Sequence, residues 1–358
     1  MTKAVRLQYG AGTRQIDSSN AHTVAFSNEM EQTVQAIQVT QYGGPEVLEL
    51  SEVPIPEPGP GQVRIKVTAT SVNFADIQGR KAPYHTSPPP PFIPGLEATG
   101  MIDAIGPGVS GFEPGQRVAG LVDGGSYAEY VLARTIGVYA VPDNVEPREA
   151  AVFSSVGTTA YNLLTLAGRI QPGETVLIHA AAGGVGSTAV QLARLLGAAR
   201  IIGTVGSAEK ADLIRSLGAD EAINYREENV SERVMQATRG AGVDVILDAV
   251  GKDTFEASLA SLALHGRLVV YGQSSGPPPA FEFGPLFSQN KAVIGYSTGG
   301  HRRSRPEVLR PAGLAVLKLL AAGRWKPVID RTLPLAQAGD AQHLVETRAT
   351  MGKVVLEI

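Results

Sequence analysis

A glycine-rich turn between an apolar run and an amphipathic segment is the feature that most constrains the fold of this chain. Residues 176–178 predict a buried strand, and residues 187–196 have helical periodicity. A strand, a glycine turn and the first turn of a helix present backbone N–H groups to a phosphate, so the pattern predicts a dinucleotide site. The predicted contacts in the turn are Ala182, Gly183, Gly184, Val185 and Gly186.

The turn departs from the usual G-x-G-x-x-G pattern at its first glycine, where this chain has Ala181. Gly183 and Gly186 retain the positions that allow close approach of a phosphate and tight packing of the helix. A glycine turn without a ligand is the alternative that this motif leaves open on its own.

The end of the next predicted strand, residues 199–204, indicates which dinucleotide binds. NAD sites have an acidic residue there that binds the ribose 2′-OH, whereas this chain has Gly206 and Ser207. A 2′-phosphate would meet no carboxylate at this place, and it could bind the Ser207 hydroxyl and the Lys210 ammonium. NADPH is therefore favoured over NADH. For Lys210, an exposed lysine on a helix face is the alternative.

Strands and helices alternate through the rest of this region. Apolar strands at residues 221–225, 243–250 and 267–271 alternate with helical segments, which predicts a doubly wound parallel sheet. Ligands of such sheets bind beyond the carboxyl ends of the strands, so two turns there are expected to border the nicotinamide half of the cofactor. The turn residues are Val250, Gly251, Gly272, Gln273 and Ser274. Turns that only punctuate the chain are the alternative.

The composition is that of a globular protein and excludes several functions. Of the 358 residues 43% are hydrophobic and 18% are charged, and the net charge of −3 gives no basic field for nucleic acid. No apolar run is long enough to cross a bilayer. The chain has no cysteine, which rules out disulfides, thiolate catalysis and cysteine-bound zinc.

The first 31 residues differ from the rest of the chain because they are polar and lack the apolar core of a secretory signal. They are expected to be a mobile extension, with a transit peptide as the alternative. From about Thr33 onward, short alternating strands such as residues 35–39 and 63–67 are separated by turn residues. A β-rich unit therefore precedes the nucleotide-binding unit.

This order of units, together with five segments, resembles the zinc-independent quinone oxidoreductases of the medium-chain dehydrogenase/reductase superfamily. The segments are Ser71-Val72-Asn73-Phe74-Ala75-Asp76, Pro94-Gly95-Leu96-Glu97-Ala98-Thr99-Gly100, residues 180–186, Ile223-Asn224-Tyr225 and Gly352-Lys353-Val354-Val355-Leu356. The resemblance implies an α/β fold with a GroES-like β-rich catalytic domain, residues 34–156 and 299–358, and a Rossmann NADPH-binding domain, residues 157–298. Residues 1–33 would be the N-terminal extension. It also implies a cytoplasmic homodimer that pairs the edge strands at residues 292–296.

The residues at the family's zinc position favour a metal-free enzyme. Zinc-binding members of the superfamily have Gly-His-Glu where this chain has Gly95-Leu96-Glu97. Leucine cannot ligate zinc, and the six histidines show no ligand spacing. Glu97 is therefore expected to hold the floor of the cleft by hydrogen bonds, and His179 to be a hydrogen-bonded core residue.

Without a Lewis acid, a conjugated acceptor is easier to reduce than a simple alcohol is to oxidise. Hydride added to a quinone or an α,β-unsaturated carbonyl gives a delocalised phenolate or enolate, which one hydrogen-bond donor and solvent can protonate. The expected substrate is therefore a small quinone or enone.

The resemblance implies roles for three residues beside the nicotinamide. Asn73 and Phe74 would lie against it, with Asn73 bonded to the ribose or the substrate, and Tyr84 would polarise the acceptor carbonyl. Asn73 and Tyr84 are thus the predicted catalytic residues, and a turn residue and simple loop packing are the respective alternatives. Well-known bacterial members have a second tyrosine where this chain has Gln78, which suggests a somewhat different substrate.

Three further cofactor contacts are implied by the resemblance. Thr159 would open a helix whose N-terminus points at the cofactor, and Tyr225 would pack against the 2′-phosphate. Arg348 would reach the cofactor from the C-terminal segment, with an exposed cation at a helix end as the alternative. Residues 296–303 would line the substrate side.

Two other functions stay open. One is an enoyl-thioester reductase, for which His301-Arg302-Arg303-Ser304-Arg305 could be a cationic docking patch. The other is an NADPH-binding protein with a non-catalytic role.

Overall fold

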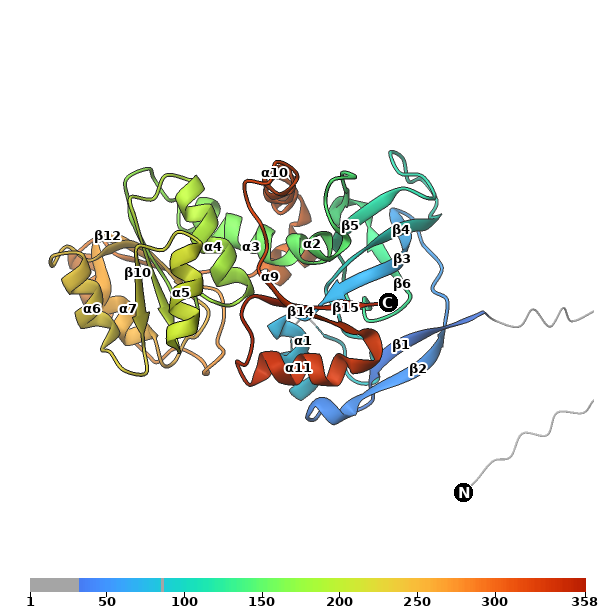
Figure 1. Cartoon of the computed structure of the whole chain (residues 1–358), viewed down its shortest axis with the longest axis horizontal. Helices are drawn as coiled ribbons and strands as arrows, with labels where there is room; N and C mark the ends of the chain where they lie inside the picture. The colour runs from blue at the N-terminus through green and yellow to red at the C-terminus, as the bar shows by residue number, and fades with distance from the viewer. Residues whose placement is uncertain (1–31, 85–86) are drawn as a thin grey trace, which may run out of the picture. The chain divides into compact units, whose positions relative to one another are not determined.

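The computed structural model describes residues 32–84 and 87–358. Within them lie a mainly antiparallel sheet, a parallel sheet and a two-stranded hairpin, and a helical run lies between the two large sheets (Figure 1). The extension predicted for residues 1–33 falls outside the described residues up to Glu31, and Thr33 begins the first strand. Among the helices of the described ranges, none is long and apolar enough to span a bilayer.

The antiparallel part is a sheet of seven strands in the order β14-β15-β3-β4-β5-β7, with β6 paired to β3. Its strands are β3 (Gln62–Ser71), β4 (Glu97–Ile105), β5 (Arg117–Leu121), β6 (Tyr130–Arg134), β7 (Val138–Ala140), β14 (Ile329–Pro334) and β15 (Lys353–Glu357). Alternation places Val63, Ile65 and Val67 of β3 in the core. β15 pairs antiparallel with β3, so the end of the chain completes this sheet. The hairpin joins β1 (Thr33–Val39) to β2 (Leu48–Pro54).

The second sheet has six parallel strands in the order β10-β9-β8-β11-β12-β13. They are β8 (Thr175–Ile178), β9 (Arg200–Val205), β10 (Glu221–Asn224), β11 (Val243–Asp248), β12 (Leu262–Val270) and β13 (Ala292–Gly295). The predicted doubly wound sheet is confirmed. The chain leaves β8 in one direction and returns to pair β11 on its other side, which is the switch point where such sheets bind ligands.

The helices of the described residues cover these sheets and connect them. They are α1 (Phe74–Lys81), α2 (Pro147–Val152), α3 (Thr158–Asn162), α4 (Gly184–Leu195), α5 (Ala208–Ser216), α6 (Val230–Ala237), α7 (Phe255–Ser261), α8 (Gly284–Ser288), α9 (Thr298–Ser304), α10 (Arg310–Ala321) and α11 (Ala338–Glu346). Two π-helical segments, η3 (Phe153–Gly157) and η4 (Leu163–Ala167), make one continuous helical run with α2 and α3.

Helix α7 ends at Ser261, because the backbone is extended at Leu262 and that residue already pairs with Val243 of β11. Helix α10 packs on α3 and η3, and its Val316 and Leu320 belong to one core cluster with Val176 of β8 and Ala119 of β5. The domain boundaries stay a prediction.

Candidate functional site

The glycine turn after β8 has its strained residue one position earlier than the motif suggests. Ala180, not Ala181, has a left-handed backbone with φ of 51°, and its carbonyl accepts a 3.0 Å hydrogen bond from Gly183 N–H. A Cβ at Gly186 would lie 2.3 Å from the Ala180 carbonyl oxygen, so only glycine fits where α4 packs against the turn. The predicted helix-packing role of Gly186 is confirmed.

The N-terminus of α4 is open to an anion. Gly183 is the N-cap and has no side chain to cap the first turn, and no acidic residue lies in that turn. The first N–H groups of a helix have no partner within the helix and carry partial positive charge. This end of α4, which holds Gly184, Val185 and Gly186, can therefore bind the pyrophosphate of a dinucleotide.

At the end of β9 the structure brings together the residues predicted to bind a 2′-phosphate. Ser207 caps α5 and accepts a 3.3 Å hydrogen bond from Lys210 N–H. A Cβ at Gly206 would lie 2.7 Å from the hydroxyl of Tyr225, so the phenol stands directly beside the strand end. Lys210 Nζ donates a 2.7 Å hydrogen bond to the carbonyl of Arg348.

Three cations gather at this strand end, and the sequence did not predict one of them, Arg226. The side chain of Arg226 reaches Gly206, where a Cβ would lie 3.4 Å from its Nε. Burial lowers the pKa of the Lys210 ammonium, and the charges of Arg226 and Arg348 lower it further. The charges of Tyr225 and Asp330 act in the opposite direction and raise it. Arg226 follows Tyr225 at the end of β10, and its place beside β9 could have been inferred from the parallel pairing of these strands. We refer to Lys210, Arg226 and Arg348 as the cation cluster.

The two turns predicted beside the nicotinamide pack against each other. Asp248 accepts hydrogen bonds from Val250 N–H at 2.7 Å and Gly251 N–H at 3.1 Å, and Ser275 N–H donates to the Val250 carbonyl at 2.9 Å. Gly251 has a φ of 86°, and a Cβ there would lie 2.5 Å from the carbonyl oxygen of Gly276. Packing alone therefore explains why the chain turns here. It stays a prediction that these turns lie near a cofactor, through Val250, Gly251, Gly272, Gln273 and Ser274.

Thr159 does not lie at a free helix N-terminus. Although α3 begins at Thr158, the residues before it form the π-helical segment η3, and Gly157 already has helical dihedral angles. The expectation that Thr159 opens a helix at a free N-terminus is therefore wrong, and its contact with the cofactor stays a prediction. The Thr159 hydroxyl lies 2.7 Å from that of Thr298, at the start of the segment predicted to line the substrate side.

Asn73 caps α1 and lies in a buried polar network. Its Nδ2 donates to Glu97 Oε1 at 3.2 Å and to the Ser71 carbonyl at 3.3 Å. Its Oδ1 accepts from Ser155 Oγ at 2.9 Å and from Lys353 Nζ at 2.8 Å. A carboxamide has two N–H donors and two acceptor lone pairs, so the side chain of Asn73 is fully engaged within the protein.

Glu97 is the fully buried centre of this network. Its Oε1 accepts from Ser71 Oγ at 2.6 Å and lies 3.3 Å from Lys353 Nζ. Its Oε2 accepts from Ser154 Oγ at 3.0 Å and from Ser155 N–H at 2.8 Å. Ser155 belongs to the π-helical segment η3, and π-helical turns are often found at functional sites. The predicted hydrogen-bonding role of Glu97 is confirmed.

Asp76 and Tyr127 extend the network beneath α1. Asp76 accepts a 2.9 Å hydrogen bond from Asn73 N–H and lies 3.4 Å from the Tyr127 hydroxyl. Burial raises the pKa of Asp76 to about 6, and hydrogen bonds and the Lys353 charge only partly oppose it. Burial also raises the pKa of Tyr127 well above its ordinary value.

The predicted substrate-side residues lie at the outer end of this region. Phe74, the first residue of α1, is 39% exposed. Burial raises the pKa of the Tyr84 phenol, while the positive charge of Arg303 lowers it, which places a cation near that phenol. Gln78 lies in the same helix as Phe74, one turn further on.

His179 is a core residue, as predicted. It is fully buried, with Nδ1 3.1 Å from Thr204 Oγ1 and Nε2 3.0 Å from Ser258 Oγ. Burial lowers its pKa, which keeps the ring neutral.

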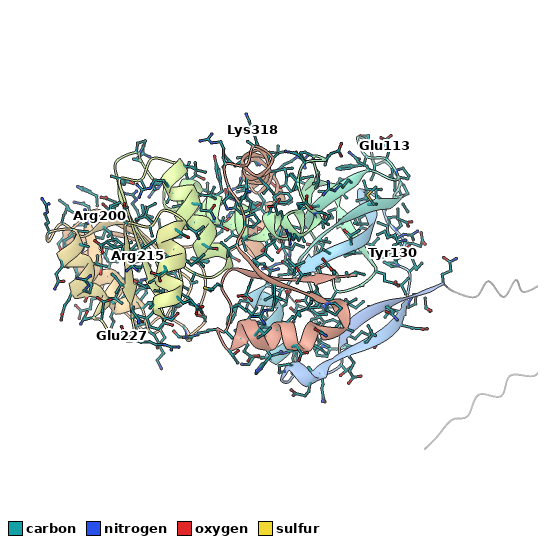
Figure 2. The ribbon with its side chains drawn as sticks, viewed as in Figure 1. Glu113, Tyr130, Arg200, Arg215, Glu227 and Lys318 are labelled. Atoms are coloured by element: carbon teal, nitrogen blue, oxygen red, sulfur yellow. The ribbon has the colours of Figure 1, made fainter. Side chains whose placement is uncertain are left out.

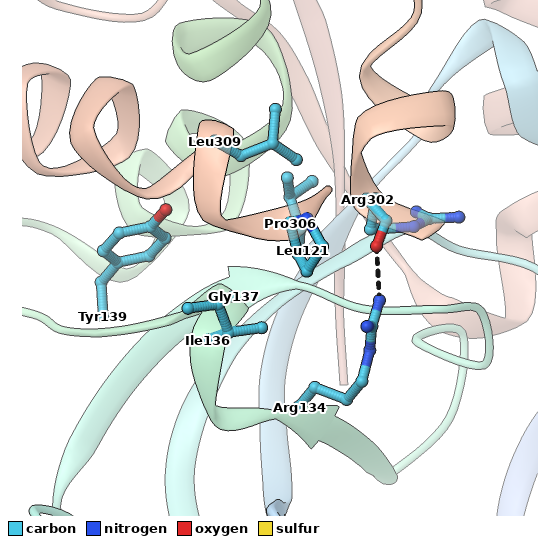
Figure 3. Close-up of a pocket in the computed structure, with 8 residues that line it drawn as sticks. All are labelled: Leu121, Arg134, Ile136, Gly137, Tyr139, Arg302, Pro306 and Leu309. Atoms are coloured by element: carbon cyan, nitrogen blue, oxygen red, sulfur yellow. Dashed lines mark hydrogen bonds between the residues drawn. The ribbon is translucent and has the colours of Figure 1, made fainter. Parts of the chain in front are cut away.

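The basic run 301–305 is not a continuous docking patch. Arg302 is buried and pairs with Asp123 at 3.2 Å, and its carbonyl accepts a 2.7 Å hydrogen bond from Arg134 (Figure 3). These two arginines line a cavity of about 20 Å³, which has room for a water molecule but not for an acyl chain. Within the part of the chain that the structure describes, no group of three or more histidine or acidic residues is arranged to hold a metal ion.

Known proteins resemble the chain over nearly all of its described length. Residues 59–143 match the model of the alcohol dehydrogenase GroES-like domain, and residues 184–312 match that of the zinc-binding dehydrogenase. A quinone oxidoreductase of Pseudomonas aeruginosa is 39% identical, covering 89% of this chain and 98% of that protein. A 2-haloacrylate reductase of Burkholderia sp. is 35% identical, covering 90% of this chain and 98% of that protein. The crystal structure of Escherichia coli quinone oxidoreductase complexed with NADPH superposes with a TM-score of 0.84, at 35% identity over 90% of this chain and 100% of that one.

Proposed function

Because the chain belongs to the quinone oxidoreductase family of the medium-chain dehydrogenase/reductase superfamily, we propose that it is an NADPH-dependent, metal-free reductase of quinones or α,β-unsaturated carbonyls. The observation that carries the proposal is the end of β9, where Gly206 and Ser207 replace the acidic residue of NAD sites beside the cation cluster. When bound, NADPH supplies hydride from C4 of its nicotinamide.

The residues present fit this cofactor at both of its phosphate sites. The uncapped N-terminus of α4 would hold the pyrophosphate. Ser207, Lys210, Arg226 and Arg348 would hold the 2′-phosphate, with Tyr225 packed beside it. Three cations at a strand end, where the charge of Asp330 acts on Lys210, favour a ligand that carries an additional phosphate.

The donor set at the family's zinc position does not fit zinc. Leu96 has no ligand atom, the chain has no cysteine, and Glu97 is already occupied by hydrogen bonds and by Lys353. The chemistry proposed here therefore uses an acceptor that delocalises the negative charge of its reduced form. Tyr84 is the phenol that we assign to the acceptor carbonyl. The relative named 2-haloacrylate reductase supports an acceptor that is a conjugated carbonyl compound and not only a quinone.

We also propose that the protein is a homodimer. Strand β13 is the edge of the parallel sheet within the described residues, and the segment just before it exposes three aromatic rings. Phe281, Phe283 and Phe287 are 46%, 70% and 76% exposed. Pairing of two β13 edges would cover both the unpaired strand and this apolar surface. A monomeric mass in light scattering would contradict this proposal.

The proposed function is tested by NADPH consumption with purified, chelator-treated protein, with NADH in parallel. A simple quinone, an enone and an enoyl-thioester are the acceptors, each corrected for uncatalysed reduction. Turnover of quinone or enone with a strong NADPH preference is the expected result. Activity with the thioester alone, or NADPH binding without turnover of any acceptor, would overturn the proposal.

A further inference from the structure

We infer that Lys353 is a positioning residue for the hydride site, because its buried ammonium fixes Asn73 and with it the first turn of α1. The inference rests on the proposed function and assigns a role to a residue that motif reasoning passed over. Lys353 begins β15 and is 4% exposed. Lysine is almost never this deeply buried unless it is paired.

All three N–H donors of Lys353 are used inside the protein. Nζ lies 2.6 Å from the Val72 carbonyl, 2.8 Å from Asn73 Oδ1 and 3.3 Å from Glu97 Oε1. The first two acceptors belong to the residues that lead directly into α1, and Glu97 belongs to β4. One cation thus joins the end of β3, the cap of α1 and the centre of the buried network.

The stem of Lys353 lies against the glycine turn. A Cβ at Gly184 would lie 2.7 Å from Lys353 Cδ, and the neighbouring Gly352 donates a 2.7 Å N–H hydrogen bond to the carbonyl of Ala182. Lys353 therefore reaches from the anion-binding end of α4 to Asn73. Through these contacts Lys353 links the position of the glycine turn to that of Phe74, the first residue of α1.

The ion pair with Glu97 requires a cation at position 353. Burial lowers the pKa of Lys353, and the charges of Glu97 and Asp76 oppose that shift. A neutral side chain at position 353 would leave Glu97 as an unpaired buried carboxylate, which is strongly unfavourable. Asp76 on α1 and Tyr127 are the other titratable groups that face this cluster.

Because the carboxamide of Asn73 is fully engaged, its influence on the hydride site is exerted through the backbone. Asn73 caps α1 with Asp76, and Phe74 follows it with a partly exposed ring. Loss of Lys353 removes one of the two hydrogen bonds that Asn73 Oδ1 accepts, and we expect the cap and Phe74 to shift as a result. A shift of about 1 Å at a reacting pair can reduce the rate about a hundredfold.

The test compares wild type with Lys353→Met, with Lys353→Met/Glu97→Gln and with Lys318→Met, an exposed lysine on α10 that serves as the matched control (Figure 2). For each protein, kcat and KM, the Kd of NADPH, the emission of bound NADPH and the free energy of unfolding are measured from about pH 5 to about pH 9. The emission of bound NADPH reports on the surroundings of the nicotinamide without requiring turnover.

In Lys353→Met we expect kcat to fall at least about tenfold with a smaller change in the Kd of NADPH, and the emission of bound NADPH to change. Glu97, without its cation, is a buried carboxylate that lacks an opposite charge, so this variant should also lose stability. In Lys353→Met/Glu97→Gln part of that stability should return, while kcat stays low because Asn73 still lacks the Lys353 contact.

Wild-type kcat and unchanged NADPH emission in folded Lys353→Met would overturn the inference. So would recovery of kcat in the double variant, because the defect would then come from the unpaired carboxylate and not from Asn73. If wild type reduces none of the acceptors, the proposed function fails, and the emission of bound NADPH still decides the role of Lys353.

Discussion

The end of β9 and the network around Glu97 are both rich in polar side chains, yet they are built in opposite ways. Around Glu97 every donor and acceptor of Asn73 and Lys353 has a protein partner, and the carboxylate is fully buried. At β9 no carboxylate of the described residues forms an ion pair with the cation cluster, although the charge of Asp330 acts on Lys210, and Tyr225 is 40% exposed. The network around Glu97 is closed, because its polar groups bond to one another, and it fixes the geometry of the protein. The cation cluster is open, because its members share the same sign of charge, and it is suited to bind an anionic ligand. The two regions should therefore respond differently to mutation.

The largest expected effect is in the closed network. Glu97→Gln removes the charge that pairs with Lys353 and should lower the free energy of unfolding by about 3–5 kcal/mol, measured by denaturant titration. Chemical denaturation of Lys353→Met/Glu97→Gln should show a smaller loss than the two single variants combined. A loss below about 1 kcal/mol in Glu97→Gln would show that the network is not the closed unit described here.

Asp76 should give the closed network a pH signature. Its folded pKa of about 6 lies above its ordinary value near 4, so the protein loses stability as the pH rises through this interval, by about 3 kcal/mol in all. Asp76→Asn should remove this loss, which is measured by denaturant titration at several pH values. An identical pH dependence in wild type and variant would contradict the burial argument.

The open cluster should affect binding and not stability. Lys210→Met should weaken NADPH by about 1.5–3 kcal/mol and leave NADH affinity nearly unchanged, because only NADPH carries the 2′-phosphate. Arg226→Met should act in the same direction. Titration calorimetry with both dinucleotides measures the effect, and Lys318→Met is the control. Equal weakening of NADPH and NADH binding would show that the 2′-phosphate does not bind at the end of β9.

The smallest expected effect is at the hydroxyl pair near the substrate side. Thr159→Val keeps the shape of the side chain and removes its bond to Thr298, which should cost about 1 kcal/mol of stability. Thermal unfolding measures the loss, and Thr298→Val gives the reciprocal control. A large change in NADPH affinity in Thr159→Val would instead place Thr159 among the direct cofactor contacts.

Local patterns in the sequence predicted the parallel sheet, the glycine turn and the pair of Ser207 and Lys210, because each depends on neighbouring residues or on regular alternation of strands, and the resemblance added Tyr225. The contact of Lys353 with Asn73 could not be predicted in this way. These two residues are 280 positions apart, and they meet because β15 pairs with β3 from the far end of the chain. The periodic pattern of residues within a strand or helix carries no information about such a contact.

Two further departures involve residues that are distant in sequence. The resemblance implied that Thr159 opens a helix, but the π-helical segment η3 precedes it, and Ser155 N–H of that segment bonds to Glu97. Arg302 belongs to a basic run that could be a docking patch, yet it is buried and pairs with Asp123.

The pairing of β15 with β3 also has a consequence for the order of assembly during translation. The six strands of the parallel sheet are contiguous between Thr175 and Gly295, so that sheet can close as soon as this stretch has left the ribosome. The sheet that begins with β3 lacks β14 and β15 until residues 329–357 have been made. The parallel sheet can therefore be complete first, and the mainly antiparallel sheet must wait for residues 329–357.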